Sequence, residues 1–194
     1  MKAWLVLGAA MLFGCATPAP EYTVQGTCTG GLAEGAYALV LPDGLAQVTG
    51  TFEQGRKNGV FTFLRSSGET VAIIPYRMDL IDGTVTLLYG PEAGAGKRKL
   101  EASYVAGALD GPKTSWYPNG VRRTAFHYTG GKLDQARAWG SDGSPVSSAD
   151  AAALAASDLD ADRRYYAVLE DVIRENQPAC AEPDPQAPDL TRDR

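Results

Sequence analysis

The chain has 194 residues, of which 44% are hydrophobic and 21% are charged, a composition typical of folded globular proteins. Acidic residues outnumber basic ones by 23 to 18, which gives a formal net charge of −5. Nucleic-acid binding needs a concentrated basic face, so this balance argues against nucleic acid as a partner. We interpret the basic cluster Lys97-Arg98-Lys99 as a solvated loop; contact with lipid headgroups is the alternative.

The N-terminus has the layout of a short export signal. Met1-Lys2-Ala3 precedes an apolar run, Trp4 to Phe13, which is too short to span a bilayer. Leu12-Phe13-Gly14-Cys15 resembles the lipobox of bacterial lipoproteins. The resemblance implies a signal peptide over 1–14, an acylated Cys15, and a lipid anchor in the cell envelope. Ala16 resembles the signal for delivery to the periplasmic face of the outer membrane in a Gram-negative host; an ordinary secreted protein cleaved near Pro18 to Pro20 is the alternative.

We expect residues 15–25 to form a tether that holds the domain off the membrane. Without Cys15, the remaining cysteines are Cys28 and Cys180, an even pair in an oxidising compartment. We predict a disulfide between them that ties the C-terminal helical region to the first repeat. The alternative is two free thiols.

A glycine-punctuated repeat occupies residues 26–146. Gly31-x3-Gly35-x8-Gly44 recurs with the same spacing from Gly55 and from Gly107. Five units therefore start near 31, 55, 79, 107 and 131, and the third has lost its turn glycine to four extra residues between Gly90 and Lys99. An aromatic residue lies three positions before each new unit, and we expect these residues to form the repeat core: Phe52, Tyr76, Tyr104 and Tyr128.

Each unit reads as a β-hairpin, because two β-prone runs flank a turn signature such as Pro118-Asn119-Gly120. A lone hairpin is marginally stable in water, so the units must join. We predict a mainly β fold in which tandem hairpins form one elongated, curved antiparallel sheet. In the second unit neither strand face is cleanly polar, so we expect the helix of the chain to cover part of the sheet.

Residues 147–177 have helical composition, with Ser147 or Ser148 as the N-cap and Pro178 after the end. We expect a break near Ser157-Asp158 that divides two helices, the second of which caps the final repeats. Its apolar stripe comprises Tyr165, Tyr166, Leu169, Val172 and Ile173. Residues 178–194 are rich in proline and acidic residues, and we expect them to be disordered.

The segment from Gly107 to Leu133 resembles a bacterial MORN-type repeat. The shared features are Gly107-x3-Gly111, Trp116-Tyr117-x-Asn119-Gly120 and Tyr128-x-x-Gly131-Lys132. In that family the repeats form curved β-hairpin sheets that contact proteins and, in some members, are suggested to contact lipids. The resemblance therefore implies a binding or scaffolding role.

Residues suited to catalysis are scarce. His127, the single histidine, lies on a predicted strand and has no second histidine to complete a zinc site. Asp158, Asp160 and Asp162 have the spacing that opens a calcium loop, but the glycine and distal glutamate of that loop are missing, so we interpret them as a solvated helix start. We expect no enzyme activity, no metal and no cofactor.

Three aromatic residues are candidates for ligand binding, although the repeat core is the more conservative interpretation: Trp116, Tyr117 and Trp139. The leading hypothesis is a non-enzymatic envelope lipoprotein whose repeat sheet binds or scaffolds another envelope protein of unknown identity. A glycan-binding or peptidoglycan-binding module is the alternative.

Overall fold

The computed structural model describes residues 22–181. The predicted signal peptide, the acylated Cys15 and the tail segment 182–194 lie outside the described residues. The elements, in chain order, are β1 (Thr23–Thr29), β2 (Leu32–Val40), β3 (Ala46–Glu53), β4 (Arg56–Lys57), β5 (Gly59–Leu64), β6 (Thr70–Arg77), β7 (Leu80–Ile81), β8 (Gly83–Leu88), η1 (Pro91–Ala93), β9 (Arg98–Val105), β10 (Ala108–Trp116), β11 (Arg122–Thr129), β12 (Lys132–Ala138) and α1 (Ser148–Glu175).

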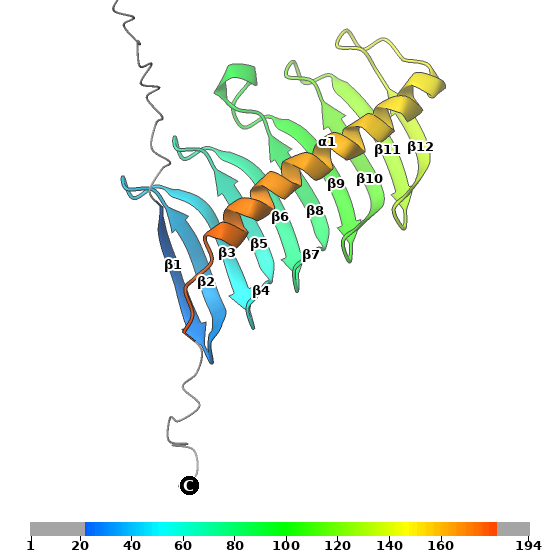
Figure 1. The fold of residues 1–194 in the computed structure, drawn as a ribbon. Coiled ribbons are helices and arrows are strands. Elements are labelled where there is room, and N and C mark those ends of the chain that lie inside the picture. Colours follow the sequence, from blue (N-terminus) through cyan, green and yellow to red (C-terminus); the bar gives the residue numbers. More distant parts are fainter. Residues whose placement is uncertain (1–21, 182–194) are drawn as a thin grey trace, which may run out of the picture.

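All twelve strands belong to one open antiparallel sheet (Figure 1). Ten strands follow each other in chain order, β1-β2-β3-β5-β6-β8-β9-β10-β11-β12, while the short β4 and β7 pair with β3 and β6. This arrangement confirms the predicted fold class, a curved sheet of tandem hairpins with a C-terminal helix against it.

The backbone conformation at the start of each repeat explains the glycine spacing. The first residue has φ between 72° and 84° in all five units, and Asp79 takes the place of glycine in the third. In the second to fifth units its N–H donates a hydrogen bond of 2.8 to 2.9 Å to a carbonyl oxygen of the preceding unit, as in Gly55 to Ala33 and Gly107 to Ile81. Residues with a Cβ are strained at such positive φ values, so glycine is favoured at the first residue of each repeat.

The four extra residues of the third unit lie in its turn. In the other units the hydrogen-bonded residues that close the turn are four apart, as in Leu41 and Leu45, whereas Tyr89 and Lys97 are eight apart. Gly96 has φ 72° and its N–H donates to the Tyr89 carbonyl oxygen. The expectation that this unit had lost its turn glycine is therefore wrong, because Gly96 fills the position after the insertion.

The N-terminal boundary of the sheet also differs from expectation. Thr23 to Gln25 were assigned to the tether, but they belong to β1, which pairs along its length with β2. An extra strand thus precedes the first repeat. At the other end, the fifth unit contributes β12 and a turn, after which the chain enters the helix.

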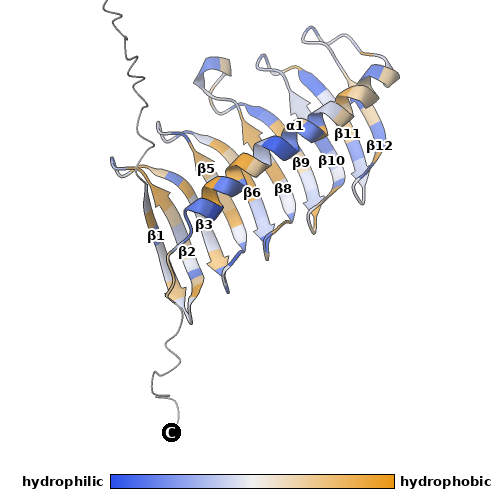
Figure 2. Ribbon diagram, viewed as in Figure 1, coloured by the Kyte–Doolittle hydropathy of each residue, from blue (hydrophilic) through white to orange (hydrophobic). Residues whose placement is uncertain are grey.

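One face of the sheet carries the hydrophobic core. The four recurrent aromatic residues, Phe52, Tyr76, Tyr104 and Tyr128, are all buried on it, with 2% to 8% of their surface exposed. Tyr37, Phe52, Phe61 and Tyr76 form a run of edge-to-face ring contacts with centroids 5.3 to 5.6 Å apart. Figure 2 shows that hydrophobic residues gather in the strands of the N-terminal half and that β10 to β12 are more hydrophilic.

A single helix covers this face. The predicted break near Ser157-Asp158 does not occur, and α1 runs unbroken from Ser148 to Glu175. Ser147 is its N-cap, and the Ser147 Oγ accepts a hydrogen bond from the Asp150 N–H at 3.1 Å. Its 28 residues give a length of about 42 Å. Ten strands spaced about 4.8 Å apart span about 43 Å, so the helix is as long as the sheet is wide.

The helix crosses the whole sheet, from β12 to β2, and is not confined to the final repeats (Figure 1). At its C-terminal end the Tyr37 hydroxyl donates to the Asn176 carbonyl oxygen at 2.9 Å. The predicted disulfide is confirmed: Cys28 on β1 is bonded to Cys180, with Cα atoms 5.6 Å apart. The predicted start of the disordered tail, residue 178, is too early. Pro178 packs against β1 so closely that a Cβ added at Gly26 would clash with the proline ring.

Candidate functional site

β-Bulges turn one residue in each of the first four repeats toward the face that the helix covers. The register of the second strand shifts by one residue just after each turn, so a single residue is left without a partner. These residues, spaced 24, 28 and 24 apart like the repeats themselves, are Gln47, Val71, Lys99 and Arg123. A bulge places two successive side chains on the same side of a sheet. The side chains of Lys99 and Arg123 therefore lie on the sheet face that α1 covers, together with the buried side chain that follows each of them.

Acidic residues of α1 meet basic residues of the sheet at three points. Arg123 donates two hydrogen bonds to Asp158, at 2.6 and 3.0 Å. Lys113 on β10 lies 2.6 Å from Asp162, and Lys57 on β4 pairs with Glu170. The four-residue step from Asp158 to Asp162 corresponds to one strand, from β11 to β10, because a helical turn rises about 5.4 Å and strands lie about 4.8 Å apart.

The pair formed by Lys113 and Asp162 is the most buried of the three. The Lys113 side chain is 0% exposed and the Asp162 side chain 15%. Lys113 Nζ and Asp162 Oδ2 have no further hydrogen-bond partner among the described residues. Burial raises the pKa of the Asp162 carboxyl, and the Lys113 ammonium opposes that shift. Desolvation offsets much of the attraction in such a pair, so its main effect is to fix the register of the helix on the sheet.

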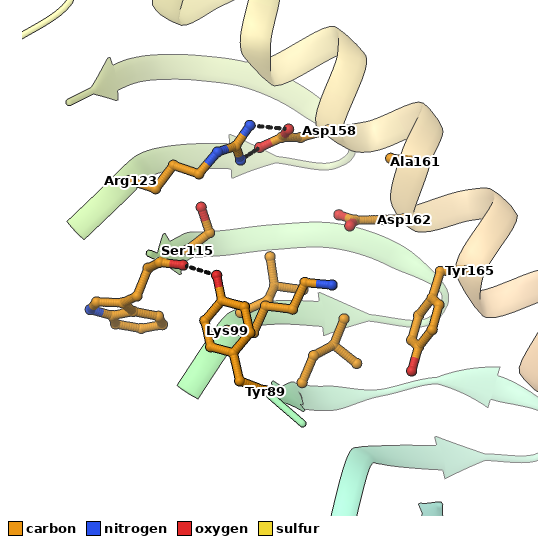
Figure 3. A pocket seen from close by; sticks show the side chains of 11 residues that line it. Tyr89, Lys99, Ser115, Arg123, Asp158, Ala161, Asp162 and Tyr165 are labelled. Carbon is orange, nitrogen blue, oxygen red and sulfur yellow. Dashed lines mark hydrogen bonds and ion pairs between the residues drawn. The ribbon is translucent and has the colours of Figure 1, made fainter. Parts of the chain in front are cut away.

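A pocket of about 380 Å³ opens between α1 and the turn ends of β8 to β11 (Figure 3). Arg123 and Asp158 close one end, Tyr165 stands at the other, and Lys99 and Tyr89 lie between them (Figure 3). The Tyr89 hydroxyl donates to the Trp116 carbonyl oxygen at 2.6 Å. Within this lining the Arg123–Asp158 pair ties the helix to the sheet, and the hydrogen bond between Tyr89 and Trp116 joins two segments of the sheet.

The described residues offer little for catalysis. Ser115 in the pocket has its hydroxyl 2.6 Å from the Thr124 hydroxyl, which is not a base. His127 is half-exposed on β11 and lies 3.2 Å from Asp134. Within residues 22–181 no group of three or more potential ligands could hold a metal ion. The interpretation of Asp158 and Asp162 as a solvated helix start is wrong, because both side chains face the sheet; Asp160 is exposed and pairs with Arg164.

The structure brings the aromatic candidates together at one end of the sheet. Trp116 and Trp139 line the same groove, and Arg122 lies between them in its lining. The Tyr117 hydroxyl donates to the Trp139 carbonyl oxygen at 3.0 Å, so Tyr117 links the fourth and fifth units. All three side chains are half-buried.

The face of the sheet opposite the helix, which we call the open face, is uncovered by any described element. A row of side chains crosses it in continuous register: Ala38, Thr49, Thr62, Ile73, Thr86, Glu101, Thr114 and Ala125. Threonine and small residues dominate this row. This row therefore carries mostly short, uncharged side chains, with Glu101 as its one charged member, and the register continues to Gln25 on β1 and Arg137 on β12.

Neither a protein-family model nor any curated protein matches this chain. Among residues 22–181, no helix is both long and apolar enough to cross a membrane.

Proposed function

We propose that this protein is a non-enzymatic lipoprotein of the cell envelope that binds another envelope protein through the open face of its sheet. The observation that carries the proposal is the uncovered row from Ala38 to Ala125, in register across eight strands, while a helix covers the opposite face. The mostly short, uncharged side chains of this row allow close approach of another polypeptide surface.

Rigidity supports this function. The helix is fixed to the sheet by three ion pairs, by the hydrogen bond between Tyr37 and Asn176, and by the disulfide at Cys180. A surface that is already ordered loses little conformational entropy on binding, which favours affinity. The membrane anchor rests on the sequence around Cys15, and the MORN-like repeat pattern favours a scaffolding role.

Arginine substitutions on the open face test the proposal. Thr62→Arg and Thr86→Arg place a long cation in the middle of the row, and each should abolish co-purification of the partner from detergent-solubilised envelopes. Val168→Arg on the outer side of α1, where Val168 is 60% exposed, is the matched control and should retain the partner. Retention of the same partner by both open-face variants, with unchanged melting temperatures, would refute binding through this face.

A further inference from the structure

Two tryptophans and two arginines alternate across neighbouring strands at the turn edge of the last repeats. The Arg98 guanidinium carbon lies 4.9 Å from the Trp116 ring centroid, and that of Arg122 lies 5.6 Å from the Trp139 centroid. Trp116 is also directly opposite Arg122 in the pairing of β10 with β11. At the equivalent position the first three units carry Val40, Leu64 and Leu88, so this feature belongs to one end of the sheet.

A groove of about 450 Å³ runs between the two tryptophans. Its lining comprises Trp116, Gly120, Val121, Arg122, Trp139 and Gly143. The two glycines are unobstructed, since a Cβ at either would meet nothing within 4 Å. This volume lies within the range of small-ligand sites.

Arg122 is the cation that remains available in this groove. Arg98 pairs with Glu101 and Arg123 pairs with Asp158, whereas Arg122 is exposed and has no carboxylate partner among the described residues. No acidic residue lines the groove, although the chain as a whole is acidic. An anionic ligand would therefore be attracted here and repelled by much of the remaining surface.

We propose that this groove binds a carboxylate-bearing oligosaccharide. The parts of the two indole rings that line the groove can contact the apolar side of a sugar ring, and the Arg122 guanidinium, held over Trp139, can pair with a carboxylate through two parallel hydrogen bonds. Neither an indole ring nor a guanidinium selects this ligand by itself, but Trp116, Arg122 and Trp139 place both kinds of group in one groove. The proposal goes beyond the binding of an envelope protein, since it adds a second ligand at a different part of the sheet.

The groove lies at the far end of the sheet from β1. Nine intervals of about 4.8 Å separate β1 from β12, or about 43 Å. Because β1 follows the predicted anchor segment, a lipid-anchored molecule would have this groove remote from its attachment point. Acidic glycans of the cell wall are one source of the ligand, and secreted uronic-acid polysaccharides are another.

Intrinsic fluorescence can report on this groove alone. The chain has three tryptophans, and Trp4 lies in the predicted signal peptide, so a protein that begins after Cys15 retains only Trp116 and Trp139. We would titrate it with N-acetylglucosaminyl-N-acetylmuramic acid, with a tri-galacturonate and with neutral chitotetraose. A saturable emission change is expected with one or both acidic probes, and at least ten-fold weaker binding of chitotetraose. Binding of only one acidic probe identifies the source, and binding of both shows that the groove recognises the carboxylate-bearing saccharide whichever source supplies it.

Arg122→Gln should weaken binding of the acidic probe at least ten-fold, while Arg122→Lys should lose less. Arg56→Gln, an exposed arginine on β4 near the other end of the sheet, is the charge-matched control and should leave binding unchanged. Three results would overturn the proposal: no saturable change with any probe, equal affinity for acidic and neutral probes, or unaltered binding by Arg122→Gln. Thr62→Arg should bind the saccharide normally, so failure of the open-face proposal and failure of this one are distinguishable.

Discussion

The tyrosines beneath the helix make the free energy of unfolding depend on pH in the alkaline range. Burial raises the pKa of Tyr37 and of Tyr104 from 10.0 to about 12, and it also raises the pKa of Tyr76 and Tyr166. The unfolded chain loses these protons near pH 10, whereas the folded protein keeps them. The native state therefore binds more protons in this window, and the free energy of unfolding falls as the pH rises from 10 to 12.

We predict that most of the phenolate absorbance at 295 nm will appear above pH 10 and together with the loss of the far-ultraviolet circular dichroism, because Tyr37, Tyr76, Tyr104 and Tyr166 keep their protons in the folded protein. A single stage centred at pH 10 with the fold intact would show that these tyrosines are accessible to solvent.

The buried pair under the helix allows a sharper test of local energetics. Lys113→Met or Asp162→Leu alone should cost about 3 to 5 kcal/mol, because each leaves an uncompensated charge in the core. The double variant should recover most of that loss. Urea denaturation would measure all three.

The exposed pair of Arg164 and Asp160 is the control for this comparison of single and double variants. Their side chains are 70% and 64% exposed, so the corresponding changes, Arg164→Met and Asp160→Leu, should each cost less than about 1 kcal/mol. Equal losses at the two pairs, or a double variant as unstable as the singles, would contradict the view that Lys113 and Asp162 are buried partners.

At the scale of elements, the disulfide holds the C-terminal end of α1 and the edge strand β1 together. It joins residues 152 apart, so its loss should lower the free energy of unfolding by about 5 kcal/mol in the chain-entropy model. In a Cys28→Ser, Cys180→Ser double variant we expect faster amide exchange in β1 and in residues 172–181, with less change in β8 to β11. An equal increase in amide exchange in all strands of the sheet would contradict a local stabilising effect of this disulfide.

Sequence patterns predicted the elements that depend on local chemistry. The glycine and aromatic spacing located the hairpins and the four extra residues, and the parity of the cysteines predicted the bridge from Cys28 to Cys180. The spacing also contained a signal that was not used: the bulge residue is the third after each turn glycine, as in Gly120 and Arg123. Counting from the glycines would have singled out Lys99 and Arg123 as inward-facing.

The course of α1 depends on long-range packing, and so it was harder to predict. Asp158 and Asp162 resemble solvated helix residues because acidic side chains in an isolated helix face water. Their basic partners lie 35 and 49 positions earlier, on β11 and β10, and only the folded sheet brings them together. Likewise, no turn glycine directly precedes β1 as one precedes the corresponding strands of the repeats, and β1 is a strand because it pairs with the edge of β2.

At the scale of the whole molecule, the matching lengths of helix and sheet create two unlike faces. The helix-covered face is closed by packing, ion pairs and a disulfide, whereas the open face presents a row of mostly short, uncharged side chains across the sheet. The groove between Trp116 and Trp139 adds a positively charged end to this surface. Under the two proposals, a protein built in this way would hold its ligands at a fixed separation.

The most direct test of this account is photo-crosslinking in living cells that express the full-length chain. A photoreactive amino acid would replace Thr62 or Thr86 on the open face, and Arg164 or Val168 on the outer side of α1. We predict that the open-face positions yield one discrete crosslinked envelope protein, which is lost in a Cys15→Ala background, and that the helix positions do not. Crosslinks to that protein from the helix positions, or none from the open face, would contradict the central claim.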